Sequence, residues 1–274
     1  MTGRRSGHID RIARILTGGV LFLSIALPLI WFVASSFLTR EAVLRGWPTW
    51  ADLNLHHYLT LAERIPLGIL LLQTLLIALT SSLLALVLAL PAALLTARLR
   101  GALSSGLYGI ALTLWLIPPI ALSLQIYFWF QWLGLYDTAA GLVLLYAVIH
   151  ATLALILLSP FADRISQRVD EMIALDGLDS FTSLVRIYIP ILAGPLLVVS
   201  VLCFLRAWSE LLFASLLTDY RTGVLSNALV GLTSGTHVAW GQLAAAGALS
   251  LLPAPLFLAV LIFTLRVRRR EISP

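Results

Sequence analysis

The strongest constraint on this chain is a set of long stretches without a single Asp, Glu, Lys or Arg. A helix crosses a hydrocarbon core about 30 Å thick with about 20 mostly apolar residues. The uncharged stretches reach or approach that length, and the polar first part of the last one is expected to form an outer loop. They are residues 15–39, 65–97, 101–136, 138–162, 187–205 and 222–265. We therefore predict an all-α integral membrane protein with six transmembrane helices near 14–36, 68–96, 107–131, 140–160, 194–216 and 242–265.

Composition excludes several classes of protein. Only 11% of the 274 residues are charged and 60% are hydrophobic, whereas a soluble domain carries about 25% charged residues. All 18 basic residues are arginines, so the chain lacks the lysine that a P-loop ATPase needs. We expect no catalytic residues and no enzymatic activity in this chain.

The arginines predict which way the chain crosses the membrane. The apolar run that begins at residue 15 exceeds the 7–15 residues of a signal peptide, so a retained first helix is favoured over a cleaved one. With both termini cytoplasmic, thirteen arginines fall on inner segments and four on outer ones, as the positive-inside rule requires. The predicted inner arginines are 4, 5, 11, 14, 98, 100, 164, 168, 186, 266, 268, 269 and 270. This orientation gives cytoplasmic tails at 1–13 and 267–274 and a periplasmic loop at 37–66.

Neither a metal site nor a nucleic-acid interface is expected. The single Cys203 lies inside a predicted helix, and the five histidines are scattered. His56 and His57 are adjacent, but neighbouring side chains point apart and no carboxylate cluster accompanies them. Nucleic-acid binding would need a basic soluble domain, which the chain lacks.

One predicted inner loop, 161–193, is long and dense in charge. We expect a short helix over Ile165–Leu175, a break at Gly177 and a second helix from Ser180, capped by Asp179 or Ser180. An apolar strip on the first helix consists of Val169, Met172 and Ile173. The strip fits a groove of a partner, or it rests on the chain itself or on lipid headgroups, and periodicity does not decide between these.

The residues of this loop resemble a known family. Residues 170–178 read Asp-Glu-Met-Ile-Ala-Leu-Asp-Gly-Leu, and 186–190 read Arg-Ile-Tyr-Ile-Pro. They are similar to the EAA loop of ABC-importer permeases of the maltose type. Glu171, Ala174, Asp176, Gly177 and Pro190 match the pattern, whereas its two alanines are replaced by Met172 and Ile173.

Three further stretches fit the same family in order and spacing. Ile117-Pro118-Pro119 lies in the third predicted helix, and Gly134-Leu135-Tyr136-Asp137-Thr138 lies in the turn after it. Trp208-Ser209-Glu210-Leu211 stands where the family has Trp-Asn-Glu-Phe. With the loop, they cover most of residues 66–270.

The resemblance implies a type I ABC-importer permease fold in the bacterial inner membrane. Residues 67–266 would form the five-helix permease domain, with the coupling loop at 161–193. The implied partners are a second homologous permease, an ATPase dimer that uses ATP and Mg²⁺, an extracytoplasmic solute-binding protein and membrane lipid. This chain itself would bind no cofactor. The residues that would couple it to the ATPase are Asp170, Glu171, Met172, Ile173, Ala174, Asp176, Gly177 and Pro190, the acidic ones meeting basic residues of the ATPase.

Arg206 and Glu210 form a second candidate site. They are four residues apart in a predicted membrane helix and so share one face. A charge at mid-bilayer costs about 3 kcal/mol, so it should be paired or face water. Either the two pair with each other, or Arg206 projects into the substrate pathway and contacts hydroxyl or anionic groups of the solute, since an arginine suits a carboxylate, sulfonate or phosphate. Trp208 and Glu210 are the further candidates for that pathway.

The implied function is ATP-driven import of a sugar or sugar-like solute by alternating access. An anionic or phosphorylated polyol, of the glycerol phosphate type, is the alternative cargo. A secondary transporter would show inverted repeats and more midplane ionisable groups. A membrane-embedded enzyme would need clustered acids, bases or metal ligands, and the sequence shows neither pattern.

Overall fold

The computed structural model describes residues 3–46, 49–99, 101–219, 221–233, 240–255, 257 and 259, and most of them are helical. By their contacts the residues divide into two units. Unit 1 comprises Met1–Pro66 and Leu229–Leu251, and unit 2 comprises Leu67–Ala228 and the residues from Leu252 on. Each unit is described by itself.

Unit 1 contains the first apolar helix and the elements that follow it. These are α1 (Gly3–Ser35), α2 (Arg40–Arg45), the 3₁₀ turn η1 (Trp50–Asp52), α3 (His56–Arg64) and α13 (Trp240–Ser250). Within α1, Arg14–Ser35 is long and apolar enough to cross a membrane. This confirms the helix predicted over 14–36.

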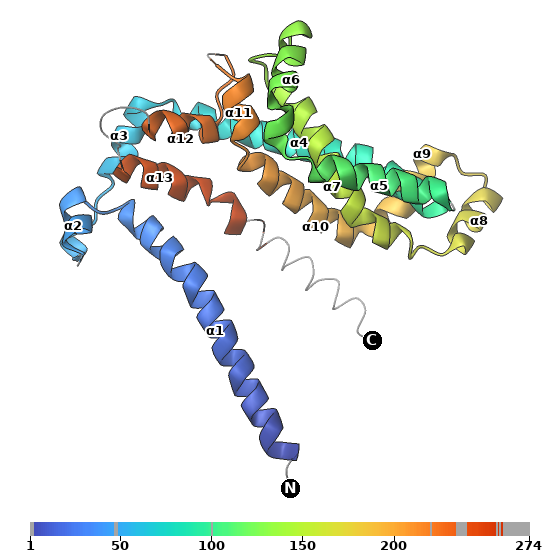
Figure 1. Ribbon diagram of the computed structural model, residues 1–274, viewed down its shortest axis with the longest axis horizontal. Coiled ribbons are helices and arrows are strands. Elements are labelled where there is room, and N and C mark those ends of the chain that lie inside the picture. Colours follow the sequence, from blue (N-terminus) through green and yellow to red (C-terminus); the bar gives the residue numbers. More distant parts are fainter. Residues whose placement is uncertain are drawn as a thin grey trace. The chain divides into compact units, whose positions relative to one another are not determined.

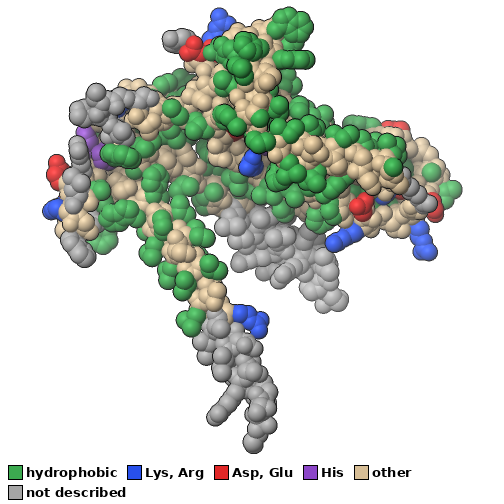
Figure 2. Space-filling model, viewed as in Figure 1, with side chains coloured by type: hydrophobic (Ala, Val, Ile, Leu, Met, Phe, Trp, Pro, Cys, Tyr) green, Lys and Arg blue, Asp and Glu red, His purple; other side chains and the backbone are tan. Residues whose placement is uncertain are grey.

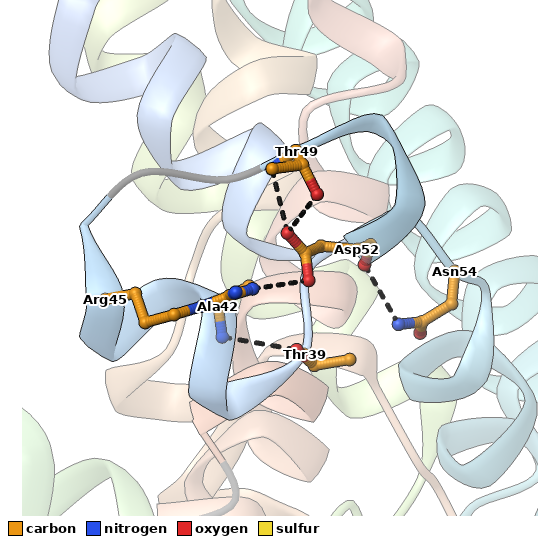
Figure 3. Close-up of polar contacts among 6 residues, drawn as sticks. All are labelled: Thr39, Ala42, Arg45, Thr49, Asp52 and Asn54. Carbon is orange, nitrogen blue, oxygen red and sulfur yellow. Dashed lines mark hydrogen bonds and ion pairs between the residues drawn. The ribbon is translucent and has the colours of Figure 1, made fainter.

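Hydrogen bonds to one carboxylate hold the connection between α1 and α3 together (Figure 3). Asp52 accepts hydrogen bonds from the Thr49 backbone N–H at 2.8 Å and from its hydroxyl at 2.7 Å, and it pairs with Arg45 at 2.6 Å. The Thr49 hydroxyl is the main reason that the pKa of Asp52 lies below its usual value. Thr39 caps α2 by accepting from the Ala42 N–H at 3.2 Å. The segment is therefore a folded turn rather than an extended loop.

Glycines let α13 approach its neighbours in unit 1 closely. A Cβ at Gly241 would overlap the ring of His57, and one at Gly247 would overlap the ring of Phe32. The His57 ring is fixed in place because its Nε2 lies 2.9 Å from the carbonyl oxygen of Leu38. The small-residue run 241–247, which suits close helix contact, does pack within the chain.

Unit 2 is built on three long helices, α4 (Leu67–Arg98), α7 (Ala139–Ala162) and α10 (Ile189–Trp208). Ile77, Tyr146 and Phe204 meet in one buried cluster. A second cluster is rich in small side chains, which allow the helix backbones to lie close together; it contains Ala89, Ala93, Ala154, Leu158, Ala162, Val199 and Cys203. The helices predicted near 68–96 and 140–160 are confirmed.

The single helix predicted near 107–131 is wrong. The chain forms α5 (Ala102–Leu116) and α6 (Pro119–Trp132), which are bent by 91° relative to each other. The residue before a proline avoids the α conformation, and Pro119 suits the first turn of a helix. The Ile117-Pro118-Pro119 motif therefore divides this span.

The helix predicted over 194–216 has different ends. It is continuous from Ser180 to Trp208, through α9 (Ser180–Ser183), the π-helical turn η2 (Leu184–Tyr188) and α10. Pro190 has no N–H to donate to the carbonyl four residues earlier, and the wider turn η2 lies directly before it. After Trp208 the chain breaks, and α11 (Leu212–Leu217) follows.

In the described residues, four helices can cross a membrane, or five spans exist if the bent pair counts as one. They are Arg14–Ser35, Leu67–Arg98, Ala139–Ala162 and Ser180–Trp208, with α5 and α6 as the bent pair. Hydrophobic side chains cover much of α5 and α7, and charged ones gather near α8 (Gln167–Leu175) (Figure 2). The chain is thus a multi-pass membrane protein.

The sixth span and the orientation stay predictions. Of the expected helix 242–265, residues 256, 258 and 260–265 lie outside the described residues, as does the tail 267–274. The same holds for Arg100, the arginines at 266 and 268–270, and the side chains at 4, 5 and 11.

We predict that Gly241→Ala destabilises unit 1, because the new methyl group overlaps the fixed ring of His57. Overpacking of this kind costs about 1–3 kcal/mol. A lower thermal midpoint of the purified protein in detergent would be the expected result. Gly231→Ala is the matched control, since nothing lies within 4 Å of its added Cβ; equal midpoints for the two variants would contradict the prediction.

Candidate functional site

The segment from α8 to α9 lies at one end of the long helices of unit 2 (Figure 1). The side chain of Ser166 caps α8 by accepting from the Arg168 N–H. The short helix, the break at Gly177 and the second helix from Ser180 are confirmed, with the first helix beginning at Gln167 rather than Ile165.

The break between α8 and α9 is a well-formed helix stop. Gly177 has φ +64°, a conformation that glycine adopts without strain. Its N–H donates to the carbonyl of Ala174 at 3.2 Å, and the Leu178 N–H donates to that of Ile173 at 3.3 Å. These two bonds define a Schellman motif, which satisfies the last carbonyls of α8.

Asp179 begins the second helix. Its carboxylate accepts from the backbone N–H groups of Phe181 and Thr182, both at 3.1 Å, and from the Thr182 hydroxyl at 2.5 Å. The hydroxyl bond is the largest reason that the pKa of Asp179 lies below its usual value. The carboxylate therefore stays ionised and caps the helix.

Asp170 ties α8 to two long helices. Two nitrogens of Arg98, at the end of α4, donate to the Asp170 carboxylate. Nε lies 2.5 Å from Oδ2, and one terminal nitrogen lies 2.9 Å from Oδ1. The Tyr188 hydroxyl donates to Oδ1 at 2.5 Å. We name Arg98, Asp170 and Tyr188 the α8 clamp. That Asp170 also meets the ATPase stays a prediction, since its carboxylate is bound within the chain and its side chain is 30% exposed.

The apolar strip of α8 is divided between two faces. Val169 packs against the cluster of Leu90, Ile165 and Leu192. Ile173 faces a groove of about 430 Å³ between α8 and the end of α4, lined by Pro91, Leu94, Ile173, Leu178, Ser180, Phe181, Ser183, Leu184 and Tyr188. Val169 therefore rests on the chain itself, which is one of the alternatives that the sequence left open, whereas Ile173 lines the groove.

The outward face of the segment carries different side chains. Met172 is 55% exposed, Leu175 is 87% exposed and Phe181 is 74% exposed. Glu171 and Asp176 are exposed beside them. Large apolar groups next to carboxylates, on a fixed helix–turn–helix, are the chemistry of a docking surface rather than of a catalytic site.

Glu210 does not pair with Arg206. Its carboxylate accepts from the Tyr146 hydroxyl at 2.7 Å and from the N–H groups of Phe213 and Ala214, each at 3.0 Å at the closest. Glu210 therefore caps α11 and joins it to α7. Among the described residues the ion pairs are those of Arg45 and Arg98, so the predicted Arg206–Glu210 pair is not formed.

Arg206 and Trp208 have opposite surroundings. Arg206 is exposed near the end of α10. Trp208 is only 8% exposed and stacks on Phe204, with ring centroids 5.8 Å apart. The role of Trp208 in a substrate pathway stays a prediction, and its ring belongs to the core of unit 2.

Asp137 belongs to the motif of residues 134–138, and the structure gives it a role that the sequence did not assign. Its φ is +52°, and Oδ1 accepts from the N–H groups of Asp219 and Thr222 while Oδ2 accepts from that of Arg221, at 2.9 to 3.0 Å. It thus fastens the loop after α11 to the turn before α7. The sequence hint to this role is that Asp137 is the one charged residue between positions 101 and 162.

No group of three or more metal-ligating side chains occurs among the described residues. His150 is 3% exposed, and its Nδ1 has no hydrogen-bond partner among them. Cys203 is a free, fully buried thiol in the core of unit 2.

Comparison with known proteins places these features in a family. The model of the family described as "Binding-protein-dependent transport system inner membrane component" matches residues 85–271, which include the α8–α9 segment, Arg206 and Glu210.

Two relatives and one solved structure show the extent of the similarity. The trehalose transport system permease protein SugB of Mycobacterium tuberculosis is 27% identical over 97% of this chain and 96% of that protein. The inner membrane ABC transporter permease protein YcjP of Escherichia coli is 31% identical, but the match spans 47% of this chain and 46% of that protein. A chain from the crystal structure of a bacterial ABC transporter involved in the import of the acidic polysaccharide alginate has a TM-score of 0.73, with 19% identity over 98% of both chains. That likeness shows the fold.

We predict that Asp170→Asn loosens α8 without unfolding unit 2. The carboxamide keeps the size of the side chain but loses the charge that Arg98 grips. Hydrogen exchange of the α8 amides should become about 10-fold faster, and Tyr188→Phe, which removes one of the three bonds, should have a smaller effect. Unchanged exchange in both variants would show that the clamp does not fix α8.

We also predict that Glu210→Leu lowers the thermal midpoint more than Tyr146→Phe does. The leucine leaves two backbone N–H groups and a hydroxyl without their acceptor, at about 1–3 kcal/mol for each buried group. The phenylalanine removes one donor and leaves the cap of α11 intact. Equal midpoints for the two variants would argue against Glu210 as the residue that holds this break together.

Proposed function

Because the chain belongs to the family of binding-protein-dependent transport system inner membrane components, we propose that it is a permease subunit of an ATP-driven ABC importer for a sugar or sugar-like solute. It would form half of the translocation pathway and move the solute by alternating access. Its place would be the bacterial inner membrane, with both termini in the cytoplasm. Family membership favours this over a secondary transporter or a membrane-embedded enzyme.

The observation that carries the proposal is the outward face of the α8–α9 segment. Met172, Leu175 and Phe181 present apolar area, and Glu171 and Asp176 present negative charge beside it. A short helix with such a face fits an apolar cleft rimmed by basic side chains. We assign this cleft to the ATPase subunit of the importer. The same subunit would bind ATP and Mg²⁺.

The α8 clamp gives this surface a mechanical connection to the membrane helices. Arg98 belongs to α4, and Tyr188 lies in η2 at the start of the helix that continues as α10. A displacement of α8 by a closing ATPase dimer would therefore pull on α4 and α10 together. Along the chain, α8 is connected to α10 through Gly177, α9 and η2, and the clamp adds a direct contact between α8 and this helix.

The remaining partners follow from the same proposal. A second permease subunit would complete the pathway, and an extracytoplasmic solute-binding protein would deliver the solute. A trehalose permease aligns with 97% of this chain, which supports a sugar as the cargo. The exposed Arg206 favours a second candidate cargo, an anionic or phosphorylated sugar or polyol.

We predict that Leu175→Asp abolishes docking of the ATPase. The side chain is 87% exposed, so the substitution leaves the fold intact, but it places a carboxylate in the apolar contact. Loss of a central apolar contact costs about 2 kcal/mol or more. Co-purification of the ATPase with the tagged permease should fall by about 10-fold or more.

Leu59→Asp is the matched control, since Leu59 is 64% exposed on α3, in the other unit. It should leave co-purification and the thermal midpoint unchanged. If Leu175→Asp retained the ATPase as well as the control does, the α8–α9 segment would not be the docking surface.

A further inference from the structure

Arg206 lies on a stripe of α10 that the described residues of the chain leave exposed. The exposed positions Val198, Leu202, Arg206 and Ser209 recur at steps of three and four, so they form one face of the helix. The opposite face, which includes Cys203, packs into the core of unit 2. The Arg206 side chain is exposed on this stripe.

No carboxylate among the described residues neutralises this guanidinium. Glu210, the acidic residue nearest in sequence, has both oxygens occupied by Tyr146 and by two backbone N–H groups. The other side chains of the stripe are apolar, apart from Ser209, whose hydroxyl donates to the carbonyl of Leu205. No described residue forms an ion pair with Arg206, whose guanidinium carries five N–H donors.

The surroundings of the stripe limit what Arg206 can contact. An arginine within a membrane-spanning helix is excluded from lipid tails and faces protein or a water-filled path. In a permease that forms half of a translocation pathway, a face of a core helix left bare by its own subunit borders that pathway or the second permease. A planar, permanently charged fork suits bidentate binding of an oxyanion.

We propose that Arg206 binds the anionic group, a carboxylate, sulfonate or phosphate, of the transported solute. The inference rests on the proposed importer function and narrows its substrate class to acidic sugars or polyols. Arg206 is then the residue that selects the charged cargo within the membrane, while hydroxyl-binding groups elsewhere would hold the rest of the solute.

The test is uptake by the whole importer, reconstituted in vesicles with its second permease, ATPase and solute-binding protein. The probes are matched pairs of solutes: glucuronate with glucose, glycerol 3-phosphate with glycerol, and a sulfonated glycoside with its neutral parent. Arg206→Gln should lower uptake of the anionic probe by about 10-fold or more, because the variant loses a charge-assisted hydrogen bond to the solute. Arg206→Lys should recover part of that uptake.

Arg221→Gln is the matched control. It removes an exposed arginine whose backbone N–H, and not its side chain, is bonded to Asp137. Its uptake of the anionic probe should equal that of the unmodified importer. Vesicles with and without anionic lipid form the second arm, because a lipid phosphate offers the same chemistry as the solute.

Four results would overturn the inference. If the unmodified importer takes up only neutral probes, the inference fails while the importer function stands. If no probe is taken up and none stimulates the ATPase, the proposed function fails with it. If Arg206→Gln reduces uptake only in vesicles with anionic lipid, the arginine binds lipid. If Arg206→Gln loses the second permease during purification, Arg206 pairs with a carboxylate of that subunit.

Discussion

The structure depends on one requirement of the membrane: a backbone N–H group that leaves a helix must find an acceptor within the protein. The chain breaks its helices within or beside the apolar spans, and carboxylates supply acceptors at those breaks. Glu210 accepts from the first N–H groups of α11, and Asp137 accepts from three N–H groups of the loop after α11. Two of the few acidic residues in the apolar part of the chain are therefore occupied by the backbone.

Because these carboxylates bind backbone N–H groups, they do not neutralise the remaining charged side chains. A carboxylate that accepts from backbone donors is not available to neutralise a neighbouring arginine or to hold a metal ion. Among the described residues, Arg206 is thereby left without an ion-pair partner. At the other end of unit 2, Asp170 is held by Arg98 and Tyr188, so the docking surface there carries Glu171 and Asp176 as its free acids.

The exposed stripe of α10 lies on a continuous helix that begins beside the proposed docking surface. This helix begins at Ser180, beside the Gly177 turn, and ends at Trp208, two residues after Arg206. The π-helical turn η2 near its beginning is the irregular part, and such turns are common at functional sites. A movement of α8 would reach Arg206 along this helix, which gives ATP-driven closure a direct route to the solute in the proposed mechanism.

The sequence alone predicted the spans at 14–36, 68–96 and 140–160, the α8–turn–α9 segment and the family. Run length and glycine or cap positions are local signals, and the described residues confirm them. Tertiary structure decided the rest, because hydropathy does not show where an apolar stretch bends or which donors a carboxylate meets. Glu210 is four residues from Arg206 in sequence, yet Tyr146 on another helix and the start of α11 occupy it. Periodicity defines the faces of a helix, but only packing decides which face is covered, and that choice buries Trp208 and leaves Arg206 exposed.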